Sequence, residues 1–276
     1  KRELKAGQDF DIVANPEFLR EGKGLKDFFN PQRIVLGSES EKALSKMKQL
    51  YQPLLDDTPL VETDPASAQM IKYASNTFLA NRISFINEIA NLCERIGADI
   101  NDVTQGMGHD DRIGHEYLQP GSGFGGPCLS KDLKALIKIG ENVDYDPHFL
   151  KAIYEKNQHQ IREVVKKIKD LVGYPLYKKV VGVYGLAFKP GTNDVRDSVA
   201  LEVIKKLKKE GVEIKAYDPK AVPEAKQEVT EISYHHDPYQ VAENTELVVI
   251  LTAWPEFKQL DFERIKSKMV EPRLLD

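Results

Sequence analysis

The chain has 276 residues, of which 41% are hydrophobic and 30% charged, and its formal net charge is −4. This length predicts more than one domain. The lack of a basic excess argues against nucleic-acid binding, and no apolar run approaches the roughly 20 residues of a membrane-spanning helix. Two widely separated cysteines do not make a disulfide framework, so a cytoplasmic location is expected.

The first part of the chain contains strands without enough neighbours to complete a sheet. Short strands are predicted at Phe10–Ala14, Gln32–Gly37 and Leu60–Thr63, with a helix at Glu41–Tyr51. Such a fragment cannot close a sheet and a core by itself. We therefore expect residues 1–63 to belong to a larger α/β domain.

A long helix is predicted to follow. Asp64 is a suitable N-cap, Pro65 fits the first helical position, and no glycine or proline interrupts the chain before Gly97. One apolar stripe of this helix consists of Ile86, Ile89, Cys93 and Ile96. Cys93 is therefore interpreted as a packing residue.

Helices also dominate the residues that come next. A short helix is predicted at Asp99–Met107, a loop at His109–Pro120, and a second long helix from Pro147 to about Leu171. Residues 64–172 are therefore predicted to form an all-α region.

Strands alternate with helices in the last part of the chain, which predicts a parallel sheet. The predicted strands are Lys179–Tyr184, Val212–Tyr217, Ile232–Tyr234, Glu246–Thr252 and Leu274–Leu275, and the predicted helices are Val199–Lys209 and Val222–Gln227. Ligands of such sheets bind beyond the carboxyl ends of the strands. The segment GLAFKPGTNDVRDS follows the first of these strands. Its Gly185, Gly191, Lys189 and Arg196 are candidates for holding a pyrophosphate through backbone N–H groups and positive charge.

A glycine-dense loop delivers Cys128 to the start of a helix within Gly121–Gly140. The apolar face of this helix comprises Leu129, Leu133, Leu136 and Ile137. A separate face is predicted to carry Cys128, Lys131, Asp132 and Ala135. Because the first turn of a helix favours an anion, Cys128 is interpreted as a reactive thiol. The alternative is a small buried side chain beside a purely structural loop.

Two other patterns receive no functional assignment. Gly121, Gly123 and Gly126 match G-x-G-x-x-G, but the polar, proline-terminated residues before them do not predict the strand that a dinucleotide fingerprint requires. The six histidines are scattered, and the His235–His236 pair has no second ligand pair at zinc spacing, so no metal site is expected.

Three motifs resemble those of the UDP-glucose/GDP-mannose 6-dehydrogenase family, in the same order and at similar spacing. They are NPEFLREG at Asn15–Gly22, FGGPCLSKDLKAL at Phe124–Leu136 and GLAFKPGTNDVRDS at Gly185–Ser198. The resemblance implies three domains in an α/β chain: a remnant of a Rossmann NAD-binding domain at 1–63, a central all-α dimerisation domain with a long helix at 64–172, and a Rossmann-like, parallel-sheet UDP-binding domain at 173–276. It also implies that both ends of the chain are cut relative to the family.

The resemblance further implies a reaction: the NAD-dependent, four-electron oxidation of the C6 hydroxyl of a nucleotide sugar such as UDP-glucose, through a thiohemiacetal and a thioester on Cys128. The implied catalytic residues are Cys128, Lys72, Asn76, Asp132 and Glu17. The implied substrate-binding residues are Phe18, Leu19, Arg112, Phe124, Gly125, Phe188 and Lys189, and the implied cofactor-binding residues are Glu21, Lys131 and Arg196. Arg112 is expected to reach the substrate of the neighbouring subunit in a homodimer.

Several alternatives remain open. GDP-mannose could replace UDP-glucose, since the three motifs are shared. The chain could bind a nucleotide sugar without activity, since the glycine-rich NAD loop is missing. Arg112 could simply pair with Asp110 or Asp111. Pro127 departs from the family, where serine, histidine or tyrosine is more usual, and it removes one N–H beside the proposed nucleophile.

Overall fold

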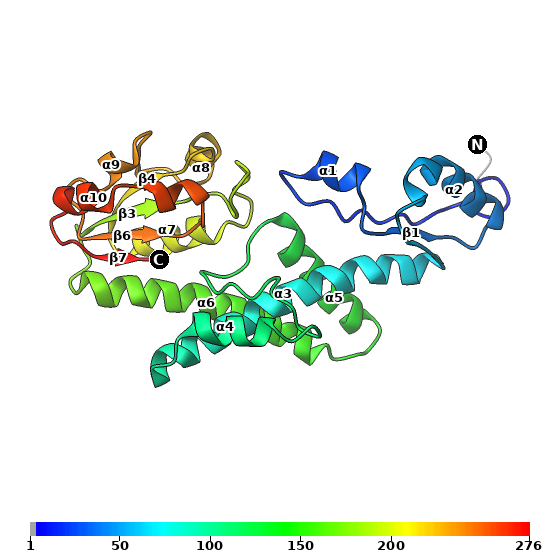
Figure 1. Ribbon diagram of the computed structural model, residues 1–276, viewed down its shortest axis with the longest axis horizontal. Helices are drawn as coiled ribbons and strands as arrows, with labels where there is room; N and C mark the ends of the chain where they lie inside the picture. Colours follow the sequence, from blue (N-terminus) through cyan, green and yellow to red (C-terminus); the bar gives the residue numbers. More distant parts are fainter. Residues whose placement is uncertain (1–3) are drawn as a thin grey trace. The chain divides into compact units, whose positions relative to one another are not determined.

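A computed structural model describes residues 4–276 and has the mixed α/β fold predicted from the sequence (Figure 1). The chain divides into two compact units, Lys1–Asn76 and Thr77–Asp276, which are described separately below. No helix within residues 4–276 is both long enough and apolar enough to cross a membrane.

The first unit is built on a two-stranded parallel sheet. Strands β1 (Ile34–Gly37) and β2 (Leu60–Thr63) pair in parallel, with Ile34 opposite Leu60. The connection between them contains helix α2 (Glu41–Leu55), whose first turn is capped because the Ser40 hydroxyl accepts a hydrogen bond from the Ala43 N–H at 3.2 Å. A short helix, α1 (Gly24–Phe29), precedes β1. Both strands confirm the prediction, and α2 extends one turn beyond the predicted end.

The predicted strand at Phe10–Ala14 is wrong. Only Ala14 pairs with the sheet, through two antiparallel hydrogen bonds of 2.8 Å with Gly37. Phe10 and Ile12 are 44% and 56% exposed. The apolar composition of FDIVA suggested a buried strand, but a strand needs a partner along its length and a surface to pack against. Among the described residues, this segment has neither.

Helix α3 (Pro65–Ile96) begins and ends where the sequence predicts. The Asp64 carboxylate accepts hydrogen bonds from the N–H and the hydroxyl of Ser67, at 2.9 and 2.6 Å, and thereby caps the first turn. These bonds lower the pKa of Asp64. Gly97 follows the helix with a φ of +76°, a conformation that favours glycine. Cys93 is buried in this helix, which confirms its interpretation as a packing residue. The predicted position of Ile96 on the same packed stripe is wrong, because its side chain is 77% exposed.

The helical part of the second unit continues with α4 (Ile100–Gly108), α5 (Pro127–Asn142) and α6 (His148–Val172). Residues 64–172, all of them described, contain no strand, as predicted. A small core of Ala80, Phe124, Leu133 and Ile153 joins α3, α5 and α6 to the loop before α5. This loop is therefore anchored in the helical core.

The last part of the chain forms a five-stranded, fully parallel sheet, and its parallel pairing was predicted. The strand order is β5-β4-β3-β6-β7. Its strands are β3 (Val180–Tyr184), β4 (Glu213–Tyr217), β5 (Ser233–Tyr234), β6 (Leu247–Ile250) and β7 (Leu274–Leu275). The connections contain helices α7 (Val199–Lys209), α8 (Val222–Glu228), α9 (Pro238–Val241) and α10 (Phe262–Lys268), and the 3₁₀ turn η1 (Pro255–Gln259). Helices α7 and α8 confirm the prediction, whereas α9, α10 and η1 were not predicted.

Helix α6 connects the helical part to the sheet. It contacts α5 through one part of its length and α7 and β6 through another (Figure 1). Apolar residues of its C-terminal half, including Ile161, Val165 and Ile168, belong to the same core as β3 and β6. The cysteine loop and the sheet are therefore fixed relative to each other by one continuous helix.

Candidate active site

Cys128 lies in the first turn of α5, as the glycine-rich loop predicts. Gly126 is the N-cap with a φ of +84°, and Pro127 occupies the first helical position. Both cysteines are free thiols, but Cys128 is exposed whereas Cys93 is buried. No strand precedes the G-x-G-x-x-G match within the described residues 109–126, which agrees with its rejection as a dinucleotide fingerprint.

Buried amide side chains hold the loop that leads to Cys128. The Asn157 amide accepts a hydrogen bond from the Phe124 N–H at 2.8 Å and donates one to the Phe124 carbonyl at 2.9 Å. The Gly121 N–H donates to Asn87 Oδ1 at 2.8 Å, and Gln160 Nε2 donates to the Gly121 carbonyl at 2.8 Å. Asn157 and Phe124 are 3% and 4% exposed, so these bonds are shielded from water.

The cysteine loop packs directly against the loop that follows β3. The Gly126 N–H donates to the Asp197 carbonyl at 3.4 Å. A Cβ atom at Gly126 would lie 2.6 Å from the Phe188 ring, and a Cβ atom at Gly125 would lie 2.5 Å from the Asp197 carbonyl oxygen. Only glycine permits this approach, so two of the three sequence motifs are brought together by a close contact between loops.

One buried carboxylate anchors the loop after β3. Asp218, at the end of β4, is 4% exposed and accepts five hydrogen bonds. The donors are the N–H groups of Leu186, Ala187, Lys220 and Ala221, at 2.7 to 3.0 Å, and the Trp254 indole, at 3.1 Å. The Ser198 hydroxyl closes the loop by donating to the Leu186 carbonyl at 2.6 Å. This loop therefore has a fixed base at the carboxyl ends of two neighbouring strands.

The predicted separation of the α5 faces is wrong at Asp132. Asp132 is 2% exposed, whereas Cys128 and Lys131 are exposed. The Lys131 ammonium forms an ion pair with the buried carboxylate at 3.0 Å. Asp132 directly precedes the fully buried Leu133, and the buried face of α5 is wide enough to include both residues. The carboxylate thus lies below the surface on which the thiol is exposed.

The predicted pyrophosphate-binding residues have local partners. Arg196 donates three hydrogen bonds from its side chain to Asp194, at 2.5 to 3.0 Å. The Lys189 ammonium lies 5.5 Å from the centre of the Phe188 ring. Gly185 and Gly191 both have positive φ, near +90°, and the Gly185 N–H already donates to the Tyr217 carbonyl at 2.8 Å. A ligand that binds Arg196 would have to compete with Asp194.

The first unit contains its own cluster of predicted site residues. The Lys72 ammonium, on α3, donates to the Glu17 carbonyl at 2.6 Å and pairs with its carboxylate at 2.9 Å. The Phe18 ring lies under the Arg33 guanidinium, 3.7 Å from its centre, and the Lys72 ammonium lies 5.5 Å away. Burial lowers the pKa of Arg33. The Leu19 N–H donates to Glu17 Oε2 at 2.6 Å.

The other two candidates of this unit are Asn76 and Glu21. Asn76 lies one helical turn after Lys72 and is half-buried, and Glu21 is exposed. The structure therefore brings Glu17, Phe18 and Lys72 together.

Arg112 makes the local contact that the sequence analysis left as an alternative. Its guanidinium binds both oxygens of Asp110 at 2.6 to 3.2 Å while the side chain remains 88% exposed. This contact lowers the pKa of Asp110. The loop around Arg112 is held by Arg82, which donates to the carbonyls of Ile113 and Gly114 at 2.8 and 3.1 Å.

Four residues that position the loops were not predicted, namely Asn87, Asn157, Gln160 and Asp218. For Asn157 and Gln160, the available signal was the presence of amides on the apolar face of α6, which also carries Ile153 and Ile161. Residues 4–276 contain no group of three or more side chains arranged to hold a metal ion.

Comparisons with known proteins place this geometry in a family. Three models of the UDP-glucose/GDP-mannose dehydrogenase family match successive segments: the NAD binding domain at residues 1–55, the central domain at 66–159 and the UDP binding domain at 182–276. UDP-glucose 6-dehydrogenase TuaD of Bacillus subtilis (strain 168) is 44% identical over 273 residues, which are 99% of this chain and 59% of that protein.

Solved structures agree with these matches. A UDP-glucose dehydrogenase from Pyrobaculum islandicum matches with a TM-score of 0.90 at 37% identity, over 98% of this chain and 64% of that one. A UDP-D-ManNAc dehydrogenase from Pyrococcus horikoshii matches with a TM-score of 0.85 at 26% identity, over 97% of this chain and 61% of that one. The chain thus spans 59% to 64% of the length of these relatives. With matches to all three domain models in order, this chain belongs to the UDP-glucose/GDP-mannose dehydrogenase family.

Proposed function

We propose that the protein containing this chain oxidises the C6 hydroxyl of UDP-glucose to the carboxylate of UDP-glucuronate, with NAD as the oxidant and Cys128 as a covalent catalyst. The observation that carries the proposal is the position of Cys128: an exposed thiol in the first turn of α5, next to a loop that packs on the motif after β3. That arrangement supports a nucleophile beside the carboxyl ends of a parallel sheet, where nucleotide ligands bind.

The proposed chemistry balances without a free aldehyde. The alcohol loses a hydride and a proton to give an aldehyde, and the Cys128 sulfur adds to its carbonyl carbon to give a thiohemiacetal. Loss of a second hydride and proton gives a thioester, and water then cleaves its C–S bond to release the carboxylate and the thiol. NAD accepts a hydride when bound, and two equivalents account for the four electrons.

The remaining catalytic roles are proposed for four polar residues. We propose that Asp132 acts with water as the base for the alcohol and that Lys72 and Asn76 stabilise the developing oxyanion. Glu17 would activate the hydrolytic water. The ion pair between Lys72 and Glu17 supports a shared role, because the ammonium stabilises the carboxylate that would hold this water.

The described residues fit NAD only in part. A Rossmann cofactor site needs a glycine-rich turn between a strand and a helix. The turn between β1 and α2 reads Gly-Ser-Glu-Ser, and a Cβ atom at Gly37 would lie 2.5 Å from Ala68, so this glycine serves close packing. We propose Glu21, Lys131 and Arg196 as cofactor contacts and derive no further step from them.

The substrate is assigned to the uridine series. The names of the most similar relatives support UDP-glucose over GDP-mannose. We propose that Lys189 and Phe188 contact the nucleotide sugar from the loop after β3, with Phe124 and Gly125 on the cysteine loop and Phe18 and Leu19 in the first unit.

A homodimer is proposed from an exposed apolar stripe on α3. Phe78, Phe85, Leu92 and Ile96 lie on one face of this helix and are 48% to 77% exposed. Large apolar side chains in such a row favour contact with another protein surface. In the dimer, we propose that Arg112 exchanges Asp110 for the substrate of the neighbouring subunit. The two free thiols favour a reducing compartment, and we propose the cytoplasm.

The decisive experiment measures NADH formation by the protein with UDP-glucose and with GDP-mannose. We expect about two NADH per UDP-glucuronate, and a loss of at least about 1000-fold in rate for Cys128→Ala. Cys93→Ala is the matched control and should retain the rate, because Cys93 is buried in α3. Full activity of Cys128→Ala would refute the covalent mechanism. Binding of UDP-glucose by calorimetry without NAD binding or NADH formation would instead favour a nucleotide-sugar-binding role without catalysis.

A further inference from the structure

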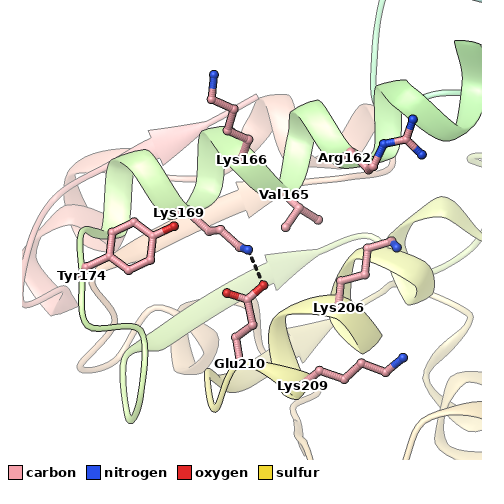
Figure 2. A pocket seen from close by; sticks show the side chains of 8 residues that line it. All are labelled: Arg162, Val165, Lys166, Lys169, Tyr174, Lys206, Lys209 and Glu210. Carbon is pink, nitrogen blue, oxygen red and sulfur yellow. Dashed lines mark hydrogen bonds and ion pairs between the residues drawn. The ribbon is translucent and has the colours of Figure 1, made fainter.

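A basic pocket lies between α6 and α7, outside the cysteine loop and the loop after β3. It has a volume of about 470 Å³. Its lining residues are Arg162, Val165, Lys166, Lys169, Tyr174, Lys206, Lys209 and Glu210 (Figure 2). Five of these eight side chains are cationic and one is acidic, in a chain whose net charge is −4. The pocket therefore concentrates charge opposite in sign to that of the whole molecule.

The cations of the pocket are only partly neutralised. Glu210 pairs with Lys169 across the gap between the helices (Figure 2). Within residues 4–276, the other four cations, which are Arg162, Lys166, Lys206 and Lys209, make no ion pair. The neighbouring lysines of α7 differ, since Lys205 pairs with Glu202 and Lys208 with Glu231. The unpaired cations of α7 are thus the two that line the pocket.

Helix electrostatics account for only some of the pocket cations. Cations in the last turn of a helix are stabilised by its dipole, which suits Lys169 on α6 and the lysines at the end of α7. Arg162 and Lys166 lie more than one turn before the end of α6 at Val172, where this effect has decayed. Like charges at i and i+4, as in this pair, repel each other and cost stability. A bound anion would remove that cost.

The volume of the pocket suits an anion of the size of a small molecule. A volume of about 470 Å³ is in the range of small-molecule sites. Val165 provides an apolar surface between the helices, and the exposed Tyr174 lies at one end (Figure 2). Arg162 and Lys206 extend from opposite helices near the other end (Figure 2). A guanidinium group and several ammonium groups that line one pocket can bind more phosphate oxygens than a single phosphate group presents.

We propose that this pocket binds a small polyphosphate compound, such as a nucleoside triphosphate or inorganic tripolyphosphate, at a site separate from the one proposed for UDP-glucose. Its phosphate oxygens would accept hydrogen bonds from Arg162, Lys206 and Lys209, with Lys166 at the rim. The proposal does not depend on the catalytic role of Cys128, because the pocket shares no residue with the cysteine loop.

The test is calorimetric titration of the full chain with tripolyphosphate and with ATP, at about 0.1 M salt and with saturating UDP to occupy the proposed nucleotide-sugar site. We expect one bound polyphosphate per chain, and affinity reduced roughly tenfold or more in the double variant Lys206→Gln/Lys209→Gln. The double variant Lys226→Gln/Lys258→Gln removes the same charge from exposed positions elsewhere and should change affinity less than about twofold.

The outcomes distinguish specific polyphosphate binding in this pocket from non-specific charge attraction. Equal binding of the two ligands supports recognition of the phosphates alone, and tighter binding of ATP supports an additional contact with its ring. An equal loss of affinity in both double variants would show non-specific charge attraction and overturn the proposal. Binding of a single-stranded oligonucleotide through the same lysines, without binding of tripolyphosphate, would also overturn it, because the site would then belong to a macromolecule.

Discussion

The amide of Asn157 offers the sharpest test of how the cysteine loop is held. Its two hydrogen bonds to the Phe124 backbone, of 2.8 and 2.9 Å, lie in a buried site. Asn157→Leu removes both partners and leaves a buried N–H and a buried carbonyl without a hydrogen bond. Each unsatisfied group costs about 1–3 kcal/mol, so for the two groups we expect the free energy of unfolding to fall by roughly 2–6 kcal/mol. Asn157→Asp keeps the acceptor but faces the Phe124 carbonyl with a second oxygen, and a loss of similar size is expected.

Urea denaturation of the chain measures the free energy, and hydrogen exchange of a peptide covering residues 121–129 measures the loop. Both variants should lose stability, and exchange in this peptide should accelerate. Asn101→Asp is the matched control, because it introduces the same charge at an exposed position in the first turn of α4, where a carboxylate is tolerated. Stability within about 0.5 kcal/mol of the parent for both Asn157 variants, with unchanged exchange, would refute the reasoning.

Three further results are expected. Asp218→Asn should destabilise the chain by about 2–4 kcal/mol in urea, because an amide NH₂ would face N–H donors that now share a carboxylate. Gly126→Ala should cost about 2–4 kcal/mol, since its φ is +84° and the new methyl group would lie 2.6 Å from the Phe188 ring, whereas Gly106→Ala, in open space on α4, should cause no loss. Burial raises the pKa of Tyr234 to about 12, so the folded state keeps this proton while an unfolded tyrosine, with a pKa of about 10, loses it. Stability should therefore fall as the pH rises from about 10 to 12, and Tyr234→Phe should reduce that fall in unfolding measurements.

The elements predicted correctly are those whose ends are fixed by capping and turn residues close to them in the sequence. The N-cap at Asp64 and the glycine at position 97 mark the ends of α3, and both do so through contacts within a few residues. The strand–helix alternation after Tyr174 likewise reports a local periodicity. The strand predicted for the FDIVA segment is wrong because strand formation also depends on distant partners. Its residues suit a strand, but only Ala14 pairs with the sheet.

In the candidate site, too, local features were predicted and contacts between distant residues were not. Glycine density predicts that a loop precedes Cys128, and the loop is present. The partners of that loop come from far along the chain: Asn87 is 34 residues before Gly121, and Asn157 is 33 residues after Phe124. Helical spacing also predicts the face of α5 on which Asp132 lies, but it does not predict the solvent exposure of that face. The packing of α5 against the rest of the domain buries the Asp132 carboxylate. Sequence patterns thus locate the nucleophile candidate, whereas tertiary contacts determine what surrounds it.

Amides rather than aliphatic side chains hold the cysteine loop because of what the loop backbone requires. The N–H and carbonyl of Phe124 are buried outside any helix or strand, so each needs a partner. A single asparagine supplies a donor and an acceptor at the correct separation, which neither leucine nor a carboxylate can do. The geometry also constrains the loop, because a Cβ atom at Gly123 would lie 2.7 Å from Asn157 Oδ1. Gly123 and Asn157 are therefore coupled. The Asn157 amide can approach the loop only because position 123 has no side chain, and the hydrogen bonds of this amide hold the loop against α6.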